Sequence, residues 1–440
     1  MLKEESRFFG KLILGDNKVV DGVWLYITDD VIYLEVPLKV LIDDRIPLIK
    51  GAFNNFGNVS FFNCYLGGGE TGVGGGYRRI IVGYMLKGGI YNSLSDLRFN
   101  LLQFESQTLV SWINDYDTLF PFDDTNVSVE FPKQKNILNV EYQGFAISIT
   151  IGRDSKSSPH RYVSNKKCFI SIRTNEAVHL DDFLDLKLKI ENFILFVTNK
   201  DPHFSKCVLI EEQRSYVELI NVSGNVKENK LPHNIRLSYI DIESDFKTVF
   251  YNWVSNDEVR TVIDLILEKC YNTELSPQGF FLNMCVAIEC YHDKFIKNDT
   301  SEDIAERLEK REMISQLIDN EELRSWFRQK SNFWTRPDMR DKLMAFEQVF
   351  KVIHGEVFPY TTKKLIDKIL KTRNTMAHDG AFDKYLSRIE LVILGKVLEY
   401  TLKVELLKLL GINKNVVDSL IEESRNNVES LAKWNEYNVK

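Results

Sequence analysis

The sequence Tyr360–Gly380, YTTKKLIDKILKTRNTMAHDG, decides how the C-terminal part of this chain is interpreted. Thr361 or Thr362 can cap a helix at its start. Apolar residues then recur three and four positions apart, the spacing that places them on one helical face. They are Leu365, Ile366, Ile369 and Leu370. The stretch therefore predicts an amphipathic helix over residues 361–377, with a C-terminal stop at Asp379-Gly380.

The end of this predicted helix carries Arg373, Asn374 and His378. Continuing the apolar spacing brings the first two to the end of the buried stripe, and His378 follows five positions after Arg373. A tightened or broken last turn would bring the imidazole toward the guanidinium. A permanently charged group that matches phosphate oxygens, beside a ring that titrates near neutrality, suits the cleavage of RNA without a metal or other cofactor.

The spacing alone is a loose signal. The chain holds three Arg and His pairs with four to six residues between them. The other two, Arg153 with His160 and Arg173 with His179, lie in strand and loop sequence and are interpreted as accidental. For the third pair, the alternative to catalysis is a salt bridge and a capping histidine at a helix end.

Length and composition define the class of protein. A chain of 440 residues exceeds one ordinary core, which predicts two or three domains, and 44% apolar residues supply sizeable cores. Six cysteines without a paired framework, and an acidic start without a secretory signal, predict a reduced, cytoplasmic protein. No segment approaches the about 20 uncharged apolar residues of a membrane span.

The net charge of −7 argues against a dedicated non-specific nucleic-acid binder, so RNA would have to meet a local basic patch. Residues 361–380 offer one, with five basic side chains against two acidic ones. The basic residues are Lys363, Lys364, Lys368, Lys371 and Arg373. The alternative interpretation of this run is an ordinary solvated helix face.

The sequence predicts an α+β multidomain chain, with β-rich lobes at residues 1–125 and 126–245 followed by an all-α domain at 246–440. Short β-prone runs separated by turn residues support the two lobes. The glycine-rich segment Gly67–Gly76 joins two predicted strands and lacks a Gly-Lys-Ser/Thr ending. We interpret it as a hairpin tip rather than a nucleotide-binding loop.

The C-terminal part has period 3.6 and predicts a helical bundle joined by short polar links. Glu289 lies among apolar positions of one predicted helix and needs a partner, for which Arg373 is a candidate. On the same helix, Cys285, Cys290 and His292 do not converge on a metal, so they are interpreted as core residues. An aromatic cluster would pack between helices or at a dimer contact, or stack bases: Trp326, Phe327, Phe333 and Trp334.

Arg373–His378 in a late helix of an all-α domain resembles the Arg-x(4–6)-His motif of HEPN domains, with the common polar residue after the arginine. The N-terminal part is similar to the first domain of ApeA-like HEPN proteins. The residues that carry this similarity are Leu48-Ile49-Lys50-Gly51, Gly57-Asn58-Val59-Ser60-Phe61 and Asn63-Cys64. The resemblance covers roughly residues 5–115 and 275–410, and no motif assigns residues 126–245.

This resemblance implies a bacterial antiphage protein that arrests growth by cutting RNA, with tRNA as the target. Its N-terminal region would sense infection, through a phage-encoded trigger, or restrain the nuclease. It also implies a homodimer whose two Arg/His pairs face one cleft. In that cleft His378 would be the general acid or base, Arg373 would stabilise the phosphate and Asn374 would orient either group. The products would be a 2′,3′-cyclic phosphate and a 5′-OH. The alternative is a non-catalytic HEPN module that binds a nucleotide or a phage component.

Overall fold

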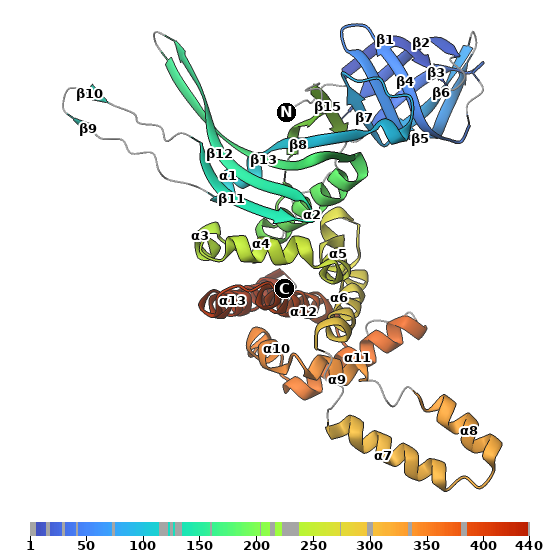
Figure 1. The fold of residues 1–440 in the computed structure, drawn as a ribbon. Helices are drawn as coiled ribbons and strands as arrows, with labels where there is room; N and C mark the ends of the chain where they lie inside the picture. Colours follow the sequence, from blue (N-terminus) through green and yellow to red (C-terminus); the bar gives the residue numbers. More distant parts are fainter. Residues whose placement is uncertain are drawn as a thin grey trace. The chain divides into compact units, whose positions relative to one another are not determined.

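The computed structural model describes residues 6–438, apart from 15–17, 29–30, 41–42, 73–74, 114–121, 124–125, 128–133, 159–160, 203, 212–215, 222–236, 273, 297–301, 333–336 and 380–384. Its contacts define two compact units (Figure 1). The N-terminal unit comprises Met1–Asn229 with Ser238–Val254, and the helical unit comprises Lys230–Leu237 with Ser255–Lys440. The predicted class, a β-rich N-terminal region followed by a helical C-terminal region, is confirmed.

The strands of the N-terminal unit form one antiparallel 13-stranded sheet in the order β11-β12-β13-β8-β14-β15-β7-β5-β4-β1-β2-β3-β6. Their bounds are β1 (Ser6–Ile13), β2 (Val19–Ile27), β3 (Ile32–Pro37), β4 (Arg45–Phe53), β5 (Gly57–Gly72), β6 (Gly75–Val82), β7 (Tyr84–Lys87), β8 (Arg98–Ser106), β11 (Lys135–Tyr142), β12 (Phe145–Ser158), β13 (Arg161–His179), β14 (Phe204–Ile210) and β15 (Tyr216–Asn221). A separate short pair joins β9 (Phe122–Asp123) to β10 (Asn126–Val127).

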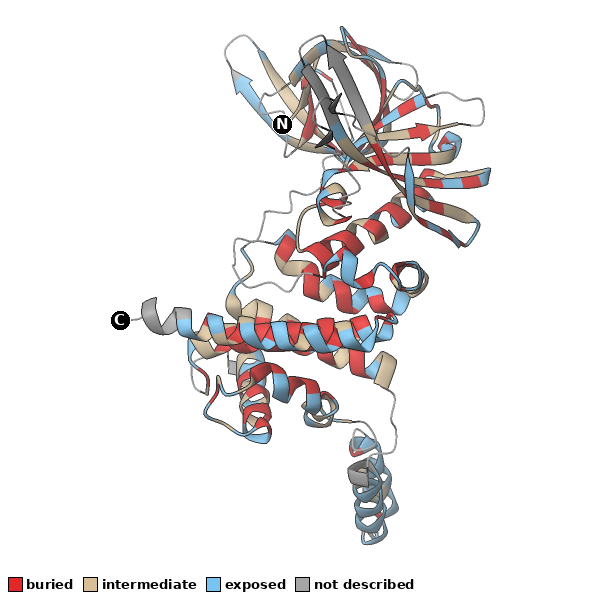
Figure 2. Ribbon diagram, turned by 90° about the vertical axis from the view of Figure 1, so that its left-hand side faces the viewer, coloured by how far each residue is buried: buried red, intermediate tan, exposed pale blue. Residues whose placement is uncertain are grey.

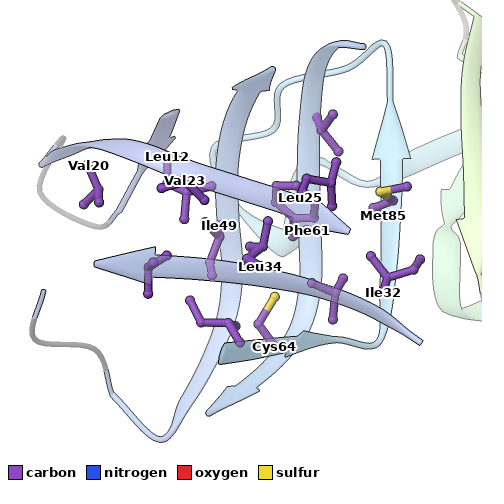
Figure 3. Packing of buried hydrophobic residues seen from close by; sticks show 14 of the residues in the cluster. Leu12, Val20, Val23, Leu25, Ile32, Leu34, Ile49, Phe61, Cys64 and Met85 are labelled. Atoms are coloured by element: carbon purple, nitrogen blue, oxygen red, sulfur yellow. The ribbon is translucent and has the colours of Figure 1, made fainter. Parts of the chain in front are cut away.

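The first strands close into a barrel, because β5 pairs with β4 on one side and with β6 on the other. Along each strand, alternate side chains point inward, which gives the barrel a continuous apolar core (Figure 3). Leu25, Leu34 and Phe61 lie at its centre and are fully buried. Closure leaves these strands paired on both sides, so the barrel presents no long unpaired edge along β5 or β6.

The glycine-rich segment joins strand to strand, as predicted. β5 runs through the glycines to Gly72, which pairs with Gly75, and residues 73–74 at the tip lie outside the described residues. A Cβ on Gly69 would lie 2.6 Å from the carbonyl oxygen of Tyr77, so the strands approach too closely there for any other residue. The glycines therefore serve strand pairing. After the glycines the chain forms two strands, β6 and β7, which are separated by Gly83.

The remaining strands form a sheet whose apolar face packs against α1 (Gln107–Ile113) and α2 (Leu180–Thr198). Strand β8, from the first predicted lobe, pairs with β13 and β14 of the second. The two predicted β-rich lobes thus share one ladder of strands, and their division at residue 125 stays a prediction. Helix α2 runs unbroken over residues 180–198, and its second half, from Asn192 to Thr198, is buried on all sides. The described part of the unit also includes the 3-10 helix η2 (Leu94–Asp96) and the helices α3 (Tyr239–Ile242) and α4 (Phe246–Ser255).

The helical unit is an assembly of helices around α12, whose residues are buried on almost every side. The bounds are α5 (Asp257–Tyr271), α6 (Pro277–Tyr291), the π-helical turn η3 (His292–Ile296), α7 (Glu302–Gln316), α8 (Glu321–Lys330), α9 (Met339–Met344), α10 (Glu347–His354), α11 (Thr362–Asp379), α12 (Arg388–Leu409) and α13 (Lys414–Asn438). Helix α12 contacts α6, α10 and α13, while α11 packs against α9 and α10. No helix among the described residues is long and apolar enough to cross a membrane.

Candidate functional site

Helix α11 carries the candidate residues and forms as the sequence predicts. Its start is capped by Thr361, whose hydroxyl accepts from the backbone N–H of Lys364 at 3.4 Å. Leu365, Ile366 and Ile369 are fully buried on the inner face. On α9, Arg340 forms a 2.8 Å ion pair with Asp367 and fastens the middle of α11. The position of the helix is therefore fixed by packing on one side and by charge on the other.

The last turn of α11 does not break. The helix continues through His378 to Asp379, so the expected swing of the imidazole toward the guanidinium does not occur. Five residues along an α-helix correspond to a rotation of about 140° and a rise of about 7.5 Å. Arg373 and His378 therefore leave the helix in diverging directions within one chain.

Arg373 lies at the margin of the buried face with 33% of its side chain exposed. Its guanidinium donates to Glu289 Oε1 at 3.0 Å and to Asn374 Oδ1 at 3.2 Å. The predicted partnership between Glu289 on α6 and Arg373 is confirmed. These bonds use two of the five N–H donors of a guanidinium and hold the group in one orientation.

His378 lies on the opposite, solvent-facing side of α11. It is exposed, as are Lys364, Lys371 and Asn374. Residues three, four and seven positions apart share a helical face, so Lys371, Asn374 and His378 lie along one line. Lys368 shares this spacing, but its ammonium is engaged by the carbonyl oxygen of Tyr385, to which it donates at 2.7 Å. The predicted basic patch is thus an exposed cationic face that ends at the imidazole.

Comparison with protein families adds an independent observation. The family model described as ApeA N-terminal domain 1 matches residues 8–253, and the model described as Apea-like HEPN matches residues 282–416. The chain belongs to the ApeA-like HEPN family. The first match includes residues 126–245, which no motif assigned, and the second includes α11. Nothing matches among curated proteins or solved structures. Membership of this family supports a nuclease of antiphage defence in general terms.

The other two Arg and His pairs of this HEPN protein have no comparable setting. Arg173 and His179 both belong to β13, and His179 caps α2 by accepting from the backbone N–H of Asp181 at 3.3 Å. That histidine therefore has a structural role. In the remaining pair, His160 lies outside the described residues.

Of the three residues of α6 and η3 that were interpreted as core, Cys285 and His292 are buried, whereas Cys290 is only half-buried. Burial raises the pKa of the Cys285 thiol to about 12, which makes it an unreactive group. Burial also lowers the pKa of His292, which is 6% exposed. Within the described part of the chain, no three His, Cys, Asp or Glu side chains are arranged to hold a metal ion. The metal-independent mechanism stays a prediction.

The helical unit also contains a buried charge cluster that the sequence did not indicate. Glu399, fully buried on α12, contacts the ammonium groups of Lys396 at 3.1 Å, Lys403 at 3.4 Å and Lys269 of α5. Lys396, Glu399 and Lys403 are spaced three and four positions apart, which is the usual pattern of exposed ion pairs on a helix. The one sequence signal for the burial of these charged residues is that most of the other residues of α12 are apolar.

Proposed function

We propose that this ApeA-like HEPN chain is a metal-independent endoribonuclease that cleaves tRNA in antiphage defence. The observation that carries the proposal is the setting of α11. Within the region matched by the HEPN family, an exposed imidazole lies at the end of a cationic face of α11, and a guanidinium held by Glu289 leaves the same end of the helix in another direction. Lys364 and Lys371 on that face can contact RNA phosphates, a sequence-independent attraction.

The chemistry needs no group from outside the chain and the substrate. His378 takes the proton from a ribose 2′-OH as a general base, or gives a proton to the 5′-oxygen as a general acid. The 2′-oxygen attacks the phosphorus, the bond from phosphorus to the 5′-oxygen breaks, and the proton lost from the first oxygen is balanced by one gained at the second. Arg373 stabilises the charge that develops on the phosphate, and Asn374 orients the phosphate or His378. The products are a 2′,3′-cyclic phosphate and a 5′-OH.

Arg373 and His378 diverge on one unbroken helix, so a single chain does not place both groups at the same phosphate. We therefore propose that two copies line a shared cleft and that their Arg/His pairs act together. The N-terminal unit then senses a phage-encoded trigger or restrains the nuclease, and the protein acts in the cytoplasm.

The test is incubation of purified protein with total RNA and with tRNA in EDTA, followed by mapping of the cut ends. Arg373→Ala and His378→Ala should each lower the cleavage rate by at least about 100-fold while leaving the circular dichroism spectrum unchanged. Arg388→Ala, which removes an exposed arginine from the start of α12, is the matched control and should keep full activity. Full activity in both site variants would refute the assignment.

The second candidate function is a binding module that uses the same surface to hold a nucleotide or a phage component. The observation in its favour is the ion pair at 3.0 Å, because Glu289 neutralises the charge of Arg373 within each chain. This function predicts that total RNA stays intact and that His378→Ala still protects cells against phage. Protection without RNA cleavage would therefore select the second candidate over the first.

A further inference from the structure

Helices α7 and α8 form a hairpin whose two helices contact each other through polar groups. Arg311 donates to Ser331 Oγ at 3.0 Å and to the backbone carbonyl of Arg328 at 2.7 Å. Arg328 in turn forms a 2.8 Å ion pair with Glu312. Among residues 305–332, whose side chains the structure describes, Ser315 and Ser331 are the buried ones. The inside of the hairpin is thus polar, the reverse of an ordinary pair of packed helices.

Most of the described part of the hairpin is exposed (Figure 2), and several of its large apolar residues are among the exposed ones. Leu323 and Trp326 of α8 are each 56% exposed, and Leu317 before α8 is 81% exposed. Leu323 and Trp326 are three positions apart and therefore share one face of α8. Exposed apolar groups gathered on one element mark an interaction surface, since single scattered ones are normal and a cluster is not.

Salt bridges connect the hairpin to the rest of the helical unit. Arg307 of α7 contacts Asp341 of α9 at 2.9 Å, and its other terminal nitrogen contacts Asp338 at 3.7 Å. Helix α9 is joined in turn to α11 by the pair of Arg340 with Asp367. The exposed surface of α8 is therefore connected, through two ion-paired contacts, to the helix that carries the candidate site.

The charges on either side of Trp326 indicate what covers this surface. Glu322 and Lys330 lie four residues before and four residues after it, so the three side chains form one row along α8. Both charged groups are exposed, and neither forms an ion pair with a described residue of its own chain. This row has an acid at one end, an aromatic ring at its centre and a base at the other. When two such rows lie antiparallel, each acid faces a base and the two rings face each other.

We propose that this face of α8 docks antiparallel on the same face of a second copy of the chain. Across the two-fold axis, Trp326 packs near its counterpart, and Glu322 of each copy meets Lys330 of the other at both ends of a helix about 15 Å long. We choose a second copy as the partner because the row of charges on α8 is complementary to itself, as a two-fold contact between identical chains requires. A contact with an unrelated protein would not need this symmetry. The two proposals are tested by different measurements: sedimentation reports the α8 contact, whereas a chain that dimerises and still leaves RNA intact would count against the nuclease alone.

The experiment is sedimentation equilibrium of the full chain, with single variants and their mixture. Trp326→Ala should weaken dimerisation by about 30-fold, as expected for a central aromatic residue. Glu322→Lys and Lys330→Glu should each weaken it several-fold, because each places like charges together at both ends. Mixing these two variants should restore association, since both charge pairs are then complementary. Glu422→Lys, an exposed acid of α13, is the matched control and should leave dimerisation unchanged.

Three outcomes overturn the proposal. A wild-type chain that stays monomeric at about 100 μM removes the second copy as occupant, and a different protein must then cover α8. A dimer that is insensitive to Trp326→Ala places the contact elsewhere. A mixture of Glu322→Lys and Lys330→Glu that associates no better than either variant alone excludes the antiparallel arrangement. Circular dichroism of each variant separates loss of the contact from loss of the hairpin itself.

Discussion

Replacing Lys396 by methionine tests the buried charge cluster of the helical unit. Three ammonium groups surround the single carboxylate of Glu399, and Lys396 is only 4% exposed. Burial lowers the pKa of Lys396 from 10.5 to about 7, although the neighbouring carboxylate opposes this shift. It also lowers the pKa of Lys403. Burial alone would raise the pKa of Glu399, but the three lysines together hold it well below its usual range.

The direction of the pH dependence follows from the pKa of Lys396. In the unfolded chain this lysine keeps its proton up to pH about 10.5, whereas in the folded chain it keeps it only up to about 7. Between these values the unfolded state binds more protons, so the free energy of unfolding rises with pH. One proton gives a slope of at most about 1.4 kcal/mol per pH unit, hence roughly 5 kcal/mol over the whole window as an upper limit. Below pH 7 this slope disappears.

Lys396→Met removes the proton and keeps a side chain of similar length. The variant should be more stable than the wild type at pH 7, by about 1–4 kcal/mol, because a buried charge is replaced by an apolar group. It should also lose most of the rise in stability between pH 7 and 9. Urea unfolding followed by circular dichroism at several pH values measures both effects, and Lys433→Met, at an exposed lysine of α13, is the control.

Parallel pH profiles for the wild type and Lys396→Met would refute the reasoning, because the titrating group would then lie elsewhere. Glu399→Gln supplies the opposite perturbation. It leaves three buried ammonium groups without their carboxylate and should destabilise the helical unit by about 3–5 kcal/mol at pH 7. If this variant were as stable as the wild type, the cluster would not be held by the contacts described.

Two further predictions concern the other regions of the chain. Glu289→Gln removes the charged partner of Arg373 and should lower the rate of RNA cleavage by about tenfold in the EDTA assay, because the guanidinium loses its fixed orientation. Gly69→Ala should lower the free energy of unfolding of the N-terminal unit by about 1–3 kcal/mol, since its Cβ would meet a backbone oxygen at 2.6 Å. Gly68→Ala, where nothing lies within 4 Å, is its control in thermal unfolding and should change little.

Local features of the fold could be predicted from the sequence, whereas long-range ones could not. The buried stripe of α11 and the hairpin at Gly67–Gly76 depend on residues close together in the chain. The partnership of Glu289 with Arg373 was predictable because a carboxylate among apolar positions needs a cation. In contrast, the pairing of β8 with β13 and β14 joins strands about 70–100 residues apart in the sequence. The alternation of residues within a strand shows which face is buried but does not indicate which strand lies beside it.

The candidate site was predictable in its residues and not in its geometry. The motif from Arg373 to His378 contains no helix-breaking residue, and α11 accordingly runs through it without a turn that would bring the two groups together. Trp326 was predicted to lie at a helix contact or a dimer contact, or to stack bases, and it is exposed within its own chain. Whether a side chain is covered by another copy cannot be read from helical spacing, because spacing gives the face and not what covers it.

The diverging pair on α11 and the uncovered face of α8 lead to one joint prediction about activity. If the same two copies that meet through α8 also complete the nuclease site, then cleavage per chain should fall when the protein is diluted below its dimerisation constant. Trp326→Ala should shift that fall to about 30-fold higher protein concentration without changing the rate at saturation, since Trp326 belongs to a different helix from Arg373 and His378. Rates measured over about 10 nM to 100 μM protein would reveal the shift. Cleavage per chain that is constant over this range, in a wild type shown to dissociate, would mean that one chain holds a complete site.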